Sequence, residues 1–335
     1  MERLIITNGD VAAERLLDSG VGQGAVLLPW RDVLHEGPVP AGLSLEELSA
    51  VRGEFIAAHM GHDVLGVLHQ FRERDAALRS HEDFDRIELW FEHDLYDQLQ
   101  LLQVLDFFAV EDRIDGLFLM QSDQHLGRLE GPEFEEVFDL GVPVTADMLE
   151  EASAAWNGFA SEAPVGLPAF AAETMGELVF LAPALQRFLC EFPAPDSGLG
   201  LTEERVLRAL AAAGEEGIPV GELFRETQSS EEAEFLGDTS FFLRLDALQF
   251  VSVPLIEGLP FESVRCADGP ETADYREFAT AVVTLTEAGE GALEGEFDHA
   301  LSNGISRWFG GTHMTPDNLW RWDREDERLI GPDEA

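Results

Sequence analysis

The stretch Leu89-Trp90-Phe91-Glu92-His93-Asp94-Leu95-Tyr96-Asp97-Gln98 decides the fold of the first part of the chain. The apolar run 87–91 predicts a buried strand, and residues 95–108 repeat apolar side chains with helical spacing. A Glu-His-Asp sequence therefore joins the end of a strand to the start of a helix. Open α/β sheets bind ligands at such junctions, because the N-terminus of the helix attracts negative charge.

The same alternation of strand and helix continues on both sides of this stretch. Helical patterns cover residues 11–17 and most of 45–80. Further strands are predicted at 4–6, 25–28 and 116–120, with a short fifth strand at 142–145. Strands that alternate with helices indicate a parallel sheet with helices on both faces. We predict a Rossmann-like α/β domain over residues 1–125.

The remaining sequence predicts a helical connector over 126–192, a linker over 193–200 and a second domain over 201–325. The second domain begins with three short helical patterns, which start at Thr202, Gly221 and Thr239. Two paired strands, 250–253 and 281–284, follow them, then a helix over 287–301 and an aromatic ending over 307–322. Three helices followed by a hairpin are typical of a winged helix, so we predict a winged-helix-like α+β domain.

The charge of the chain indicates its solvent rather than its partners. The 335 residues include 66 acidic and 21 basic residues, for a formal net charge of -45, and all the basic residues are arginine. Hydrophobic residues make up 45% of the chain, which is typical of a globular protein. Since concentrated salt screens repulsion between surface charges, this composition predicts a halophilic protein adapted to molar salt.

The cysteines and the apolar runs indicate the compartment. Cys190 and Cys266 are far apart and form no metal-binding motif, which favours a reduced, cytoplasmic setting. The strand expected directly after Met1 leaves no room for a signal peptide. No apolar run approaches the roughly 18 residues that a membrane span needs. We therefore expect no membrane partner.

Polar side chains follow three of the predicted strands, and the carboxyl ends of parallel strands meet at one edge of a sheet. We expect a catalytic set of His35, His93, Glu92 and Asp94, in which the two histidines act as acid and base. The ligand would be contacted by Asn8, Gly9, Asp10, Arg31, Asp32, Glu36, Asp97 and Gln98. Asn8-Gly9-Asp10 suits a phosphate or ribose, and Arg31 suits a phosphate or carboxylate.

Several of these residues also have structural explanations. Asp10 can cap the first helix, Asp94 and Asp97 fit a variant of the capping box, and His35 can be a loop residue. Histidines with carboxylates can also bind a divalent metal. If the helix has begun by His93, then His93 and Asp97 stand one turn apart, which permits either shared metal ligation or a plain hydrogen bond. We assign no residue as a metal ligand. The sequence does not identify a cofactor, and a divalent metal is one alternative.

Other motifs argue against particular functions. The run Gly20-Val21-Gly22-Gln23-Gly24 follows a helix and precedes a strand, which is the wrong order for a dinucleotide fingerprint. The pattern 239–249, which would read DNA in a winged helix, carries only Arg244 as a cation, so nucleic acid is an unfavoured partner. Packing or homodimerisation is the favoured role of the second domain. The arginines and tryptophans near Trp308 and Trp322 suit either base stacking or, as we favour, pinning of a terminal hairpin.

Three long motifs resemble a bacterial family known as domain of unknown function 1835. They are Thr7-Asn8-Gly9-Asp10, the run Pro29-Trp30-Arg31-Asp32-Val33-Leu34-His35-Glu36-Gly37-Pro38, and Leu89-Trp90-Phe91-Glu92-His93-Asp94 with Gln98. The resemblance covers roughly the first 125 residues. The endings Arg307-Trp308-Phe309-Gly310-Gly311 and Trp320-Arg321-Trp322-Asp323 are similar to the tail of longer family members. The resemblance implies the fold segment and the site, but no established reaction.

Two functional hypotheses follow from these patterns. The first is an enzyme, a hydrolase or transferase, that acts on a nucleotide or phosphorylated small molecule by histidine and carboxylate acid–base chemistry. In this hypothesis Glu92, Asp94 and Asp97 orient the histidines or hold a metal. The alternative is a ligand-sensing regulator whose winged-helix domain binds DNA or a protein partner.

Overall fold

The computed structural model describes residues 2–173 and 176–334, which form two compact units. The first unit takes Met1–His35, Val39–Gly53 and Leu65–Gln186. The second takes Glu36–Pro38, Glu54–Val64 and Arg187–Ala335. This division differs from the predicted 1–125, 126–192 and 201–325, because the helices of the expected connector as far as Gln186 pack with the sheet and form no separate part.

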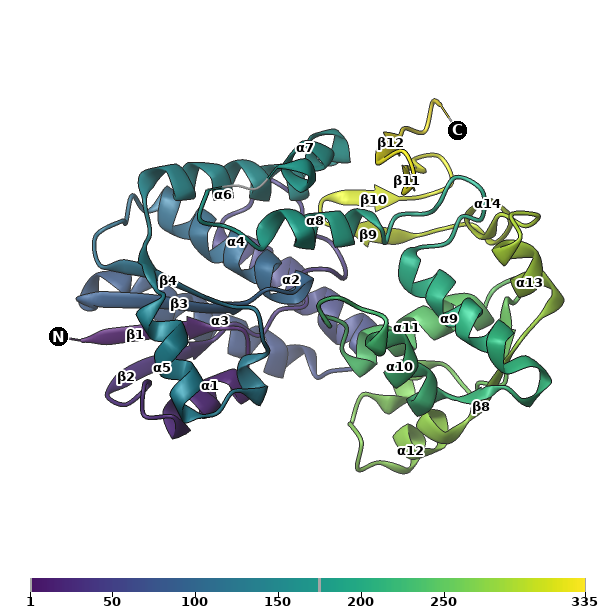
Figure 1. The fold of residues 1–335 in the computed structure, drawn as a ribbon, viewed down its shortest axis with the longest axis horizontal. Helices are drawn as coiled ribbons and strands as arrows, with labels where there is room; N and C mark the ends of the chain where they lie inside the picture. The colour runs from purple at the N-terminus through teal and green to yellow at the C-terminus, as the bar shows by residue number, and fades with distance from the viewer. Residues whose placement is uncertain (1, 174–175, 335) are drawn as a thin grey trace. The chain divides into compact units, whose positions relative to one another are not determined.

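The first unit is built on a five-stranded sheet of order β2-β1-β3-β4-β5 (Figure 1). Its first four strands are parallel, and β5 pairs with β4 in the antiparallel direction. The strands are β1 (Arg3–Thr7), β2 (Ala25–Pro29), β3 (Arg86–Glu92), β4 (Leu117–Ser122) and β5 (Val142–Pro143). The α/β class is therefore confirmed, with a mixed sheet in place of a purely parallel one.

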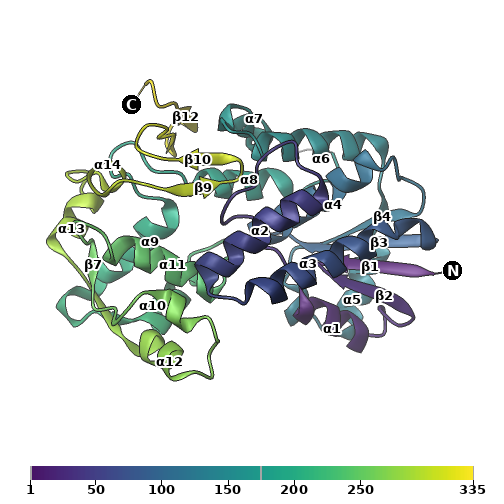
Figure 2. The same cartoon turned by 180° about the vertical axis from the view of Figure 1, so that it is seen from behind.

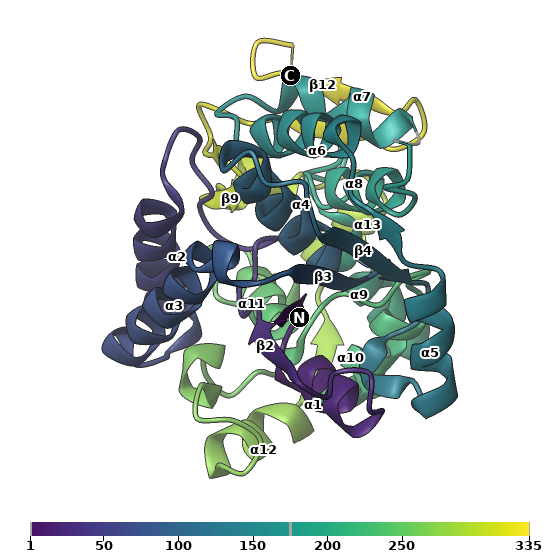
Figure 3. The same ribbon diagram turned by 90° about the vertical axis from the view of Figure 1, so that its left-hand side faces the viewer.

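Helices cover both faces of this sheet, which explains the long apolar run of the central strand β3. On one face, α1 and α5 share a core with Ile5, Trp90 and Met120, and on the other face α4 packs against β3, with α6 behind it (Figure 3). The helices are α1 (Asp10–Asp18), α2 (Leu45–Met60), α3 (Val64–Arg79), α4 (Leu95–Val110), α5 (Gly131–Asp139), α6 (Ala146–Phe159), α7 (Leu167–Ala172) and α8 (Leu181–Leu189).

The second unit contains helices, a three-stranded sheet and two hairpins (Figure 2). Its helices are α9 (Leu201–Ala213), α10 (Val220–Ser229), α11 (Asp238–Gln249), α12 (Ala273–Thr280), α13 (Glu287–Leu293) and α14 (His299–Asn303). The antiparallel sheet has the order β6-β8-β7, formed by β6 (Ile218–Pro219), β7 (Ile256–Glu257) and β8 (Val282–Leu285). One hairpin joins β9 (Arg307–Phe309) to β10 (Thr312–Met314), and the other joins β11 (Arg321–Asp323) to β12 (Arg328–Ile330).

Two predicted elements of the second unit are wrong. Residues 250–253 form bends, because the Asn303 side chain bonds both the N–H and the C=O of Val253, and Pro254 follows. The strand that pairs with β8 is β7 instead. The helix expected over 287–301 is divided into α13 and α14, because Gly295 between them has a φ of 73°. A left-handed residue ends a helix.

The run 193–200, predicted as a linker, is packed into the second unit. Ala194, Ser197 and Leu199 are buried, and Ala194 N–H bonds Leu199 O at 3.0 Å. Trp322 N–H donates to Pro193 O at 3.1 Å, and Arg321 donates to Ala194 O at 2.7 Å. The favoured interpretation of the arginine and tryptophan ending, a pinned hairpin, is supported by these contacts.

Helix length and composition bear on the membrane prediction. Among the described residues, every helix is too short or too polar to cross a bilayer.

Candidate functional site

Side chains from β1 and β3 meet at the carboxyl edge of the sheet. Asn8 directly follows β1, and its amide donates to Glu92 Oε1 at 3.1 Å and to Asp97 Oδ2 at 2.8 Å. Glu92 is the last residue of β3, and Asp97 lies in the first turn of α4. One amide group therefore joins two buried carboxylates from neighbouring elements.

The start of α4 fixes the positions of two aspartates. Asp94 is the N-cap, with extended backbone, and its Oδ1 accepts the Asp97 N–H at 3.2 Å, as half of a capping box would. Asp97 Oδ1 accepts the Glu92 N–H at 2.7 Å. Because α4 begins at Leu95, His93 lies before the helix, and the sharing of a metal between His93 and Asp97 stays a prediction.

A histidine that the sequence prediction missed completes this group. His125 Nδ1 lies 2.6 Å from Glu92 Oε2 and 3.8 Å from Asp94 Oδ2. One donor atom from each of Glu92, Asp94 and His125 lies within 4.8 Å of the others, and we call these three residues the carboxylate–histidine cluster. His125 follows β4 after a polar run, so the rule applied to the other strand ends would have identified it.

Burial and like charges control protonation in this region. Burial, followed by the charge of Glu92, raises the pKa of Asp94 to about 7. Burial and the charge of Asp94 also hold the pKa of Asp97 well above its ordinary value. The hydrogen bond to Glu92 raises the pKa of His125. Buried carboxyl groups with a raised pKa beside a histidine are typical of sites that carry out acid–base chemistry.

The two predicted catalytic histidines have different neighbours. His93 lies with its ring centroid 6.1 Å from that of His125 and 5.8 Å from that of Phe180. Burial, followed by the charge of His125, lowers the pKa of His93, which favours the neutral imidazole. His35 is buried with its ring edge-on to Tyr96 at 6.0 Å. The ring contact therefore associates His93 with His125 of the cluster, while His35 contacts Tyr96.

Asp10, at the start of α1, does not have the capping role that the sequence predicted for it. Asp10 does not cap α1, because the helix begins at Asp10 and Gly9 is its N-cap. The Asp10 carboxylate instead accepts from Arg31 Nε at 2.8 Å, at the surface. Gly9 has extended backbone, and a Cβ there would meet nothing within 4 Å. The local backbone therefore does not itself require glycine at this position.

Three further predicted ligand residues are buried in the protein interior. Asp32 accepts from Arg52 Nη2 at 2.8 Å, with both side chains 0% exposed. Glu36 belongs to the second unit, where Arg244 donates to its Oε2 at 2.5 Å. Gln98 donates to Glu92 O at 2.7 Å. These contacts make Asp32 and Glu36 internal ion-pair partners, and their contact with a ligand stays a prediction.

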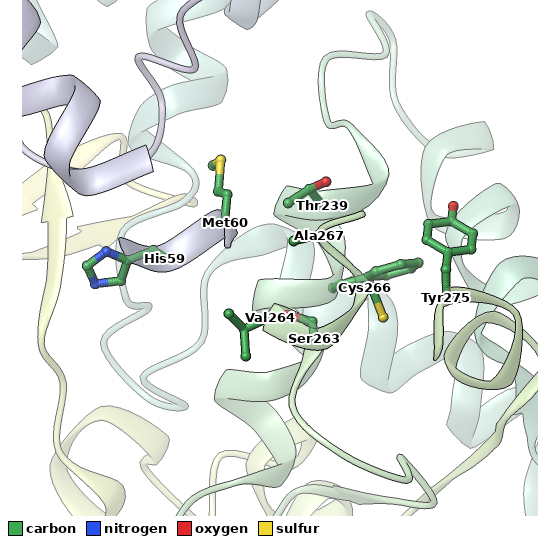
Figure 4. A pocket seen from close by; sticks show the side chains of 9 residues that line it. His59, Met60, Thr239, Ser263, Val264, Cys266, Ala267 and Tyr275 are labelled. Carbon is green, nitrogen blue, oxygen red and sulfur yellow. The ribbon is translucent and has the colours of Figure 1, made fainter. Parts of the chain in front are cut away.

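A small cavity in the second unit is a competing candidate (Figure 4). The space between its lining residues, open solvent included, is about 260 Å³, and the lining includes His59, Cys266 and Tyr275. Burial, followed by the charge of Asp246, raises the pKa of the Cys266 thiol to about 11. Since the thiolate is the nucleophile, a thiol that stays protonated at neutral pH is a poor one. The cavity is also smaller than typical ligand sites, so the sheet edge is the stronger candidate.

Replacing Arg52 by Met should show that Asp32 serves stability. The change leaves a buried carboxylate without its closest partner, so we expect the free energy of unfolding to fall by about 3–5 kcal/mol. Arg31→Ala is the matched control, since it breaks an ion pair whose side chains are 42% and 60% exposed. That change should cost less than about 1 kcal/mol. Equal losses in urea unfolding in molar salt would contradict the assignment.

The Asp246 carboxyl, which bonds Ser263 beside the cavity, should make stability depend on pH. Burial raises its pKa to about 6, above the ordinary 3.8, so the folded chain binds this proton more tightly than the unfolded chain. The stabilising proton is lost as pH rises through this window. From pH 5 to 7.5, the wild type should lose about 1 kcal/mol more than Asp246→Asn in urea unfolding. Identical pH slopes would refute this.

Comparisons with known proteins leave the site to be interpreted from its own geometry. No family model matches the chain, and no curated protein sequence matches it. The resemblance to domain of unknown function 1835 therefore stays a prediction.

Proposed function

We propose that the first unit is an enzyme that binds a nucleotide or a phosphorylated small molecule at the carboxyl edge of its sheet. The observation that carries this proposal is the hydrogen bond from Asn8, after β1, to Glu92, at the end of β3. In the order β2-β1-β3-β4, the chain runs from β1 to β2 on one side and then returns past β1 to β3 on its other side. The strand order thus reverses between β1 and β3, and such a switch point is where α/β sheets bind ligands. The same order supports the Rossmann-like interpretation of this unit.

In this proposal His93 acts as the general base. Its imidazole is favoured in the neutral form, and its Nδ1 is buried without a hydrogen-bond partner in the part of the chain that the structure describes. The carboxylate–histidine cluster beside it supplies a proton or a fixed charge to the reacting group. Hydrolysis or group transfer at a phosphorylated substrate uses these functions. Arg31 is a phosphate contact in this proposal, although the phosphate would first have to displace Asp10.

The alternative, a regulator that binds DNA, receives less support. The order of α9, β6, α10, α11, β7 and β8 is compatible with a winged-helix-like domain. In such a domain α11 would enter the groove, but its single cation Arg244 is buried against Glu36. Apart from Thr239, the residues of α11 are buried or half-buried. Homodimerisation through this unit stays a prediction.

A screen of nucleotides and phosphorylated small molecules by thermal shift in molar salt tests the proposal. A ligand at 100 times its Kd should stabilise the native state by about 2.7 kcal/mol. His93→Gln should keep this shift but lower turnover of the identified compound by about 10²–10⁴-fold, because only the base is lost. The matched control is His69→Gln, whose side chain is 70% exposed and should leave both unchanged.

Two results would count against the proposal. One is the absence of any stabilising compound in the screen. The other is turnover by His93→Gln at the wild-type rate. This result would show that His93 is not the general base, although the remaining side chains could still bind the ligand.

A further inference from the structure

Buried carboxylates divide into two groups according to their partners. Nine are buried among the described residues, and six of them lie within 4.0 Å of an arginine nitrogen. These six are Asp32, Glu36, Asp75, Glu88, Glu191 and Glu203. In the described chain, the other three, Glu92, Asp94 and Asp97, have no arginine partner. Among the described residues, buried carboxylates are therefore paired with guanidinium groups except at the carboxyl end of β3 and the start of α4.

The charge at this exception does not balance. His125 is the one cationic side chain in ion-pair contact with the three carboxylates in the described structure, at 2.6 Å from Glu92 and 3.8 Å from Asp94. When the three carboxylates are ionised and His125 is neutral, as a metal ligand must be, the net charge is −3. Buried charges in proteins are paired or coordinate a metal. A divalent cation would offset two of these three charges.

We propose that Glu92, Asp94 and His125 bind one divalent cation of the Mn²⁺ class. Carboxylates suit Mg²⁺ and Mn²⁺, and imidazole suits first-row transition metals, so the mixed set favours a metal acceptable to both. The three donor atoms lie within 4.8 Å of one another. Donors that share an ion with bonds of about 2.1 Å lie at most about 4.2 Å apart, so small side-chain movements complete the site.

The surroundings of the cluster are built to orient these ligands. Glu92 Oε1 accepts from Asn8 Nδ2 at 3.1 Å and from the Leu126 N–H at 2.8 Å, which leaves Oε2 toward His125. Asp94 uses Oδ1 for the Asp97 N–H, and its Oδ2 is the atom nearer His125. Gln98, which is 0% exposed and bonds the Glu92 carbonyl, keeps its Oε1 without a partner among the described residues. Fixed ligands and an unsatisfied buried acceptor are both typical of a site built for an additional group.

Titration of the full chain with Mn²⁺ alone, in molar potassium chloride, tests the proposal. We expect one Mn²⁺ per chain by electron paramagnetic resonance of the free ion. Asp94→Asn should weaken this binding at least tenfold, and His125→Ala should do the same. Asn caps a helix as well as Asp does, and the change removes one like charge, so Asp94→Asn should fold at least as stably without metal. Co²⁺ should give a visible ligand-field spectrum that changes in His125→Ala, because a nitrogen ligand is lost.

The control is Asp246→Asn, which removes a half-buried carboxylate of the second unit and should leave Mn²⁺ binding unchanged. It separates a defined site from the general attraction of an acidic surface. The proposal is overturned if the wild type shows no stoichiometric site, or if Asp94→Asn binds Mn²⁺ as tightly as the wild type. The Mn²⁺ titration contains no nucleotide, so a negative result there does not decide whether the first unit is an enzyme. In the same way, a negative result in the thermal-shift screen does not decide whether the cluster binds Mn²⁺.

Discussion

The carboxylate of Glu92 is the contact on which the edge of the sheet depends. Asn8 bonds it from the end of β1, while His125 and the Leu126 backbone bond it from the segment after β4. Three segments that are distant in sequence are therefore held by one side chain at the end of the central strand. Without an acceptor at this position, the Leu126 N–H would be buried and unpaired, which destabilises the fold, and Asn8 would keep only its bond to Asp97.

The acidic composition of the chain and its buried arginines are related, because the arginines pair with those carboxylates that lie in the interior. The planar guanidinium group presents several donors, so one arginine serves several carboxylates. Arg187 contacts both Glu191 and Glu231, and Arg307 lies near Glu36, Glu191 and Glu203. The large negative charge is thus a property of the surface, where salt screens it, while most buried charges are balanced locally.

The sequence predicted those features that depend on residues close together in the chain. It did not predict contacts between residues that are distant in sequence. The apolar run of β3 and the cap at Asp94 were predicted correctly, because both depend on neighbouring residues. The ion pairs of Asp10 and Asp32 were not predicted, because Arg31 and Arg52 reach them only in the folded chain. His125 was missed although its strand was predicted, and the strand proposed at 250–253 failed because Asn303, about fifty residues away, binds that segment.

The three carboxylates without arginine partners also have a consequence for protein engineering. A selection that rewards only thermal resistance would first accept neutral residues at Asp94 or Asp97, since each removes a buried repulsion with Glu92 that the fold otherwise tolerates. Stability and activity commonly oppose each other at such positions. Consensus or laboratory-evolved thermostable forms of this protein would therefore gain robustness at the sheet edge by giving up whatever that edge does.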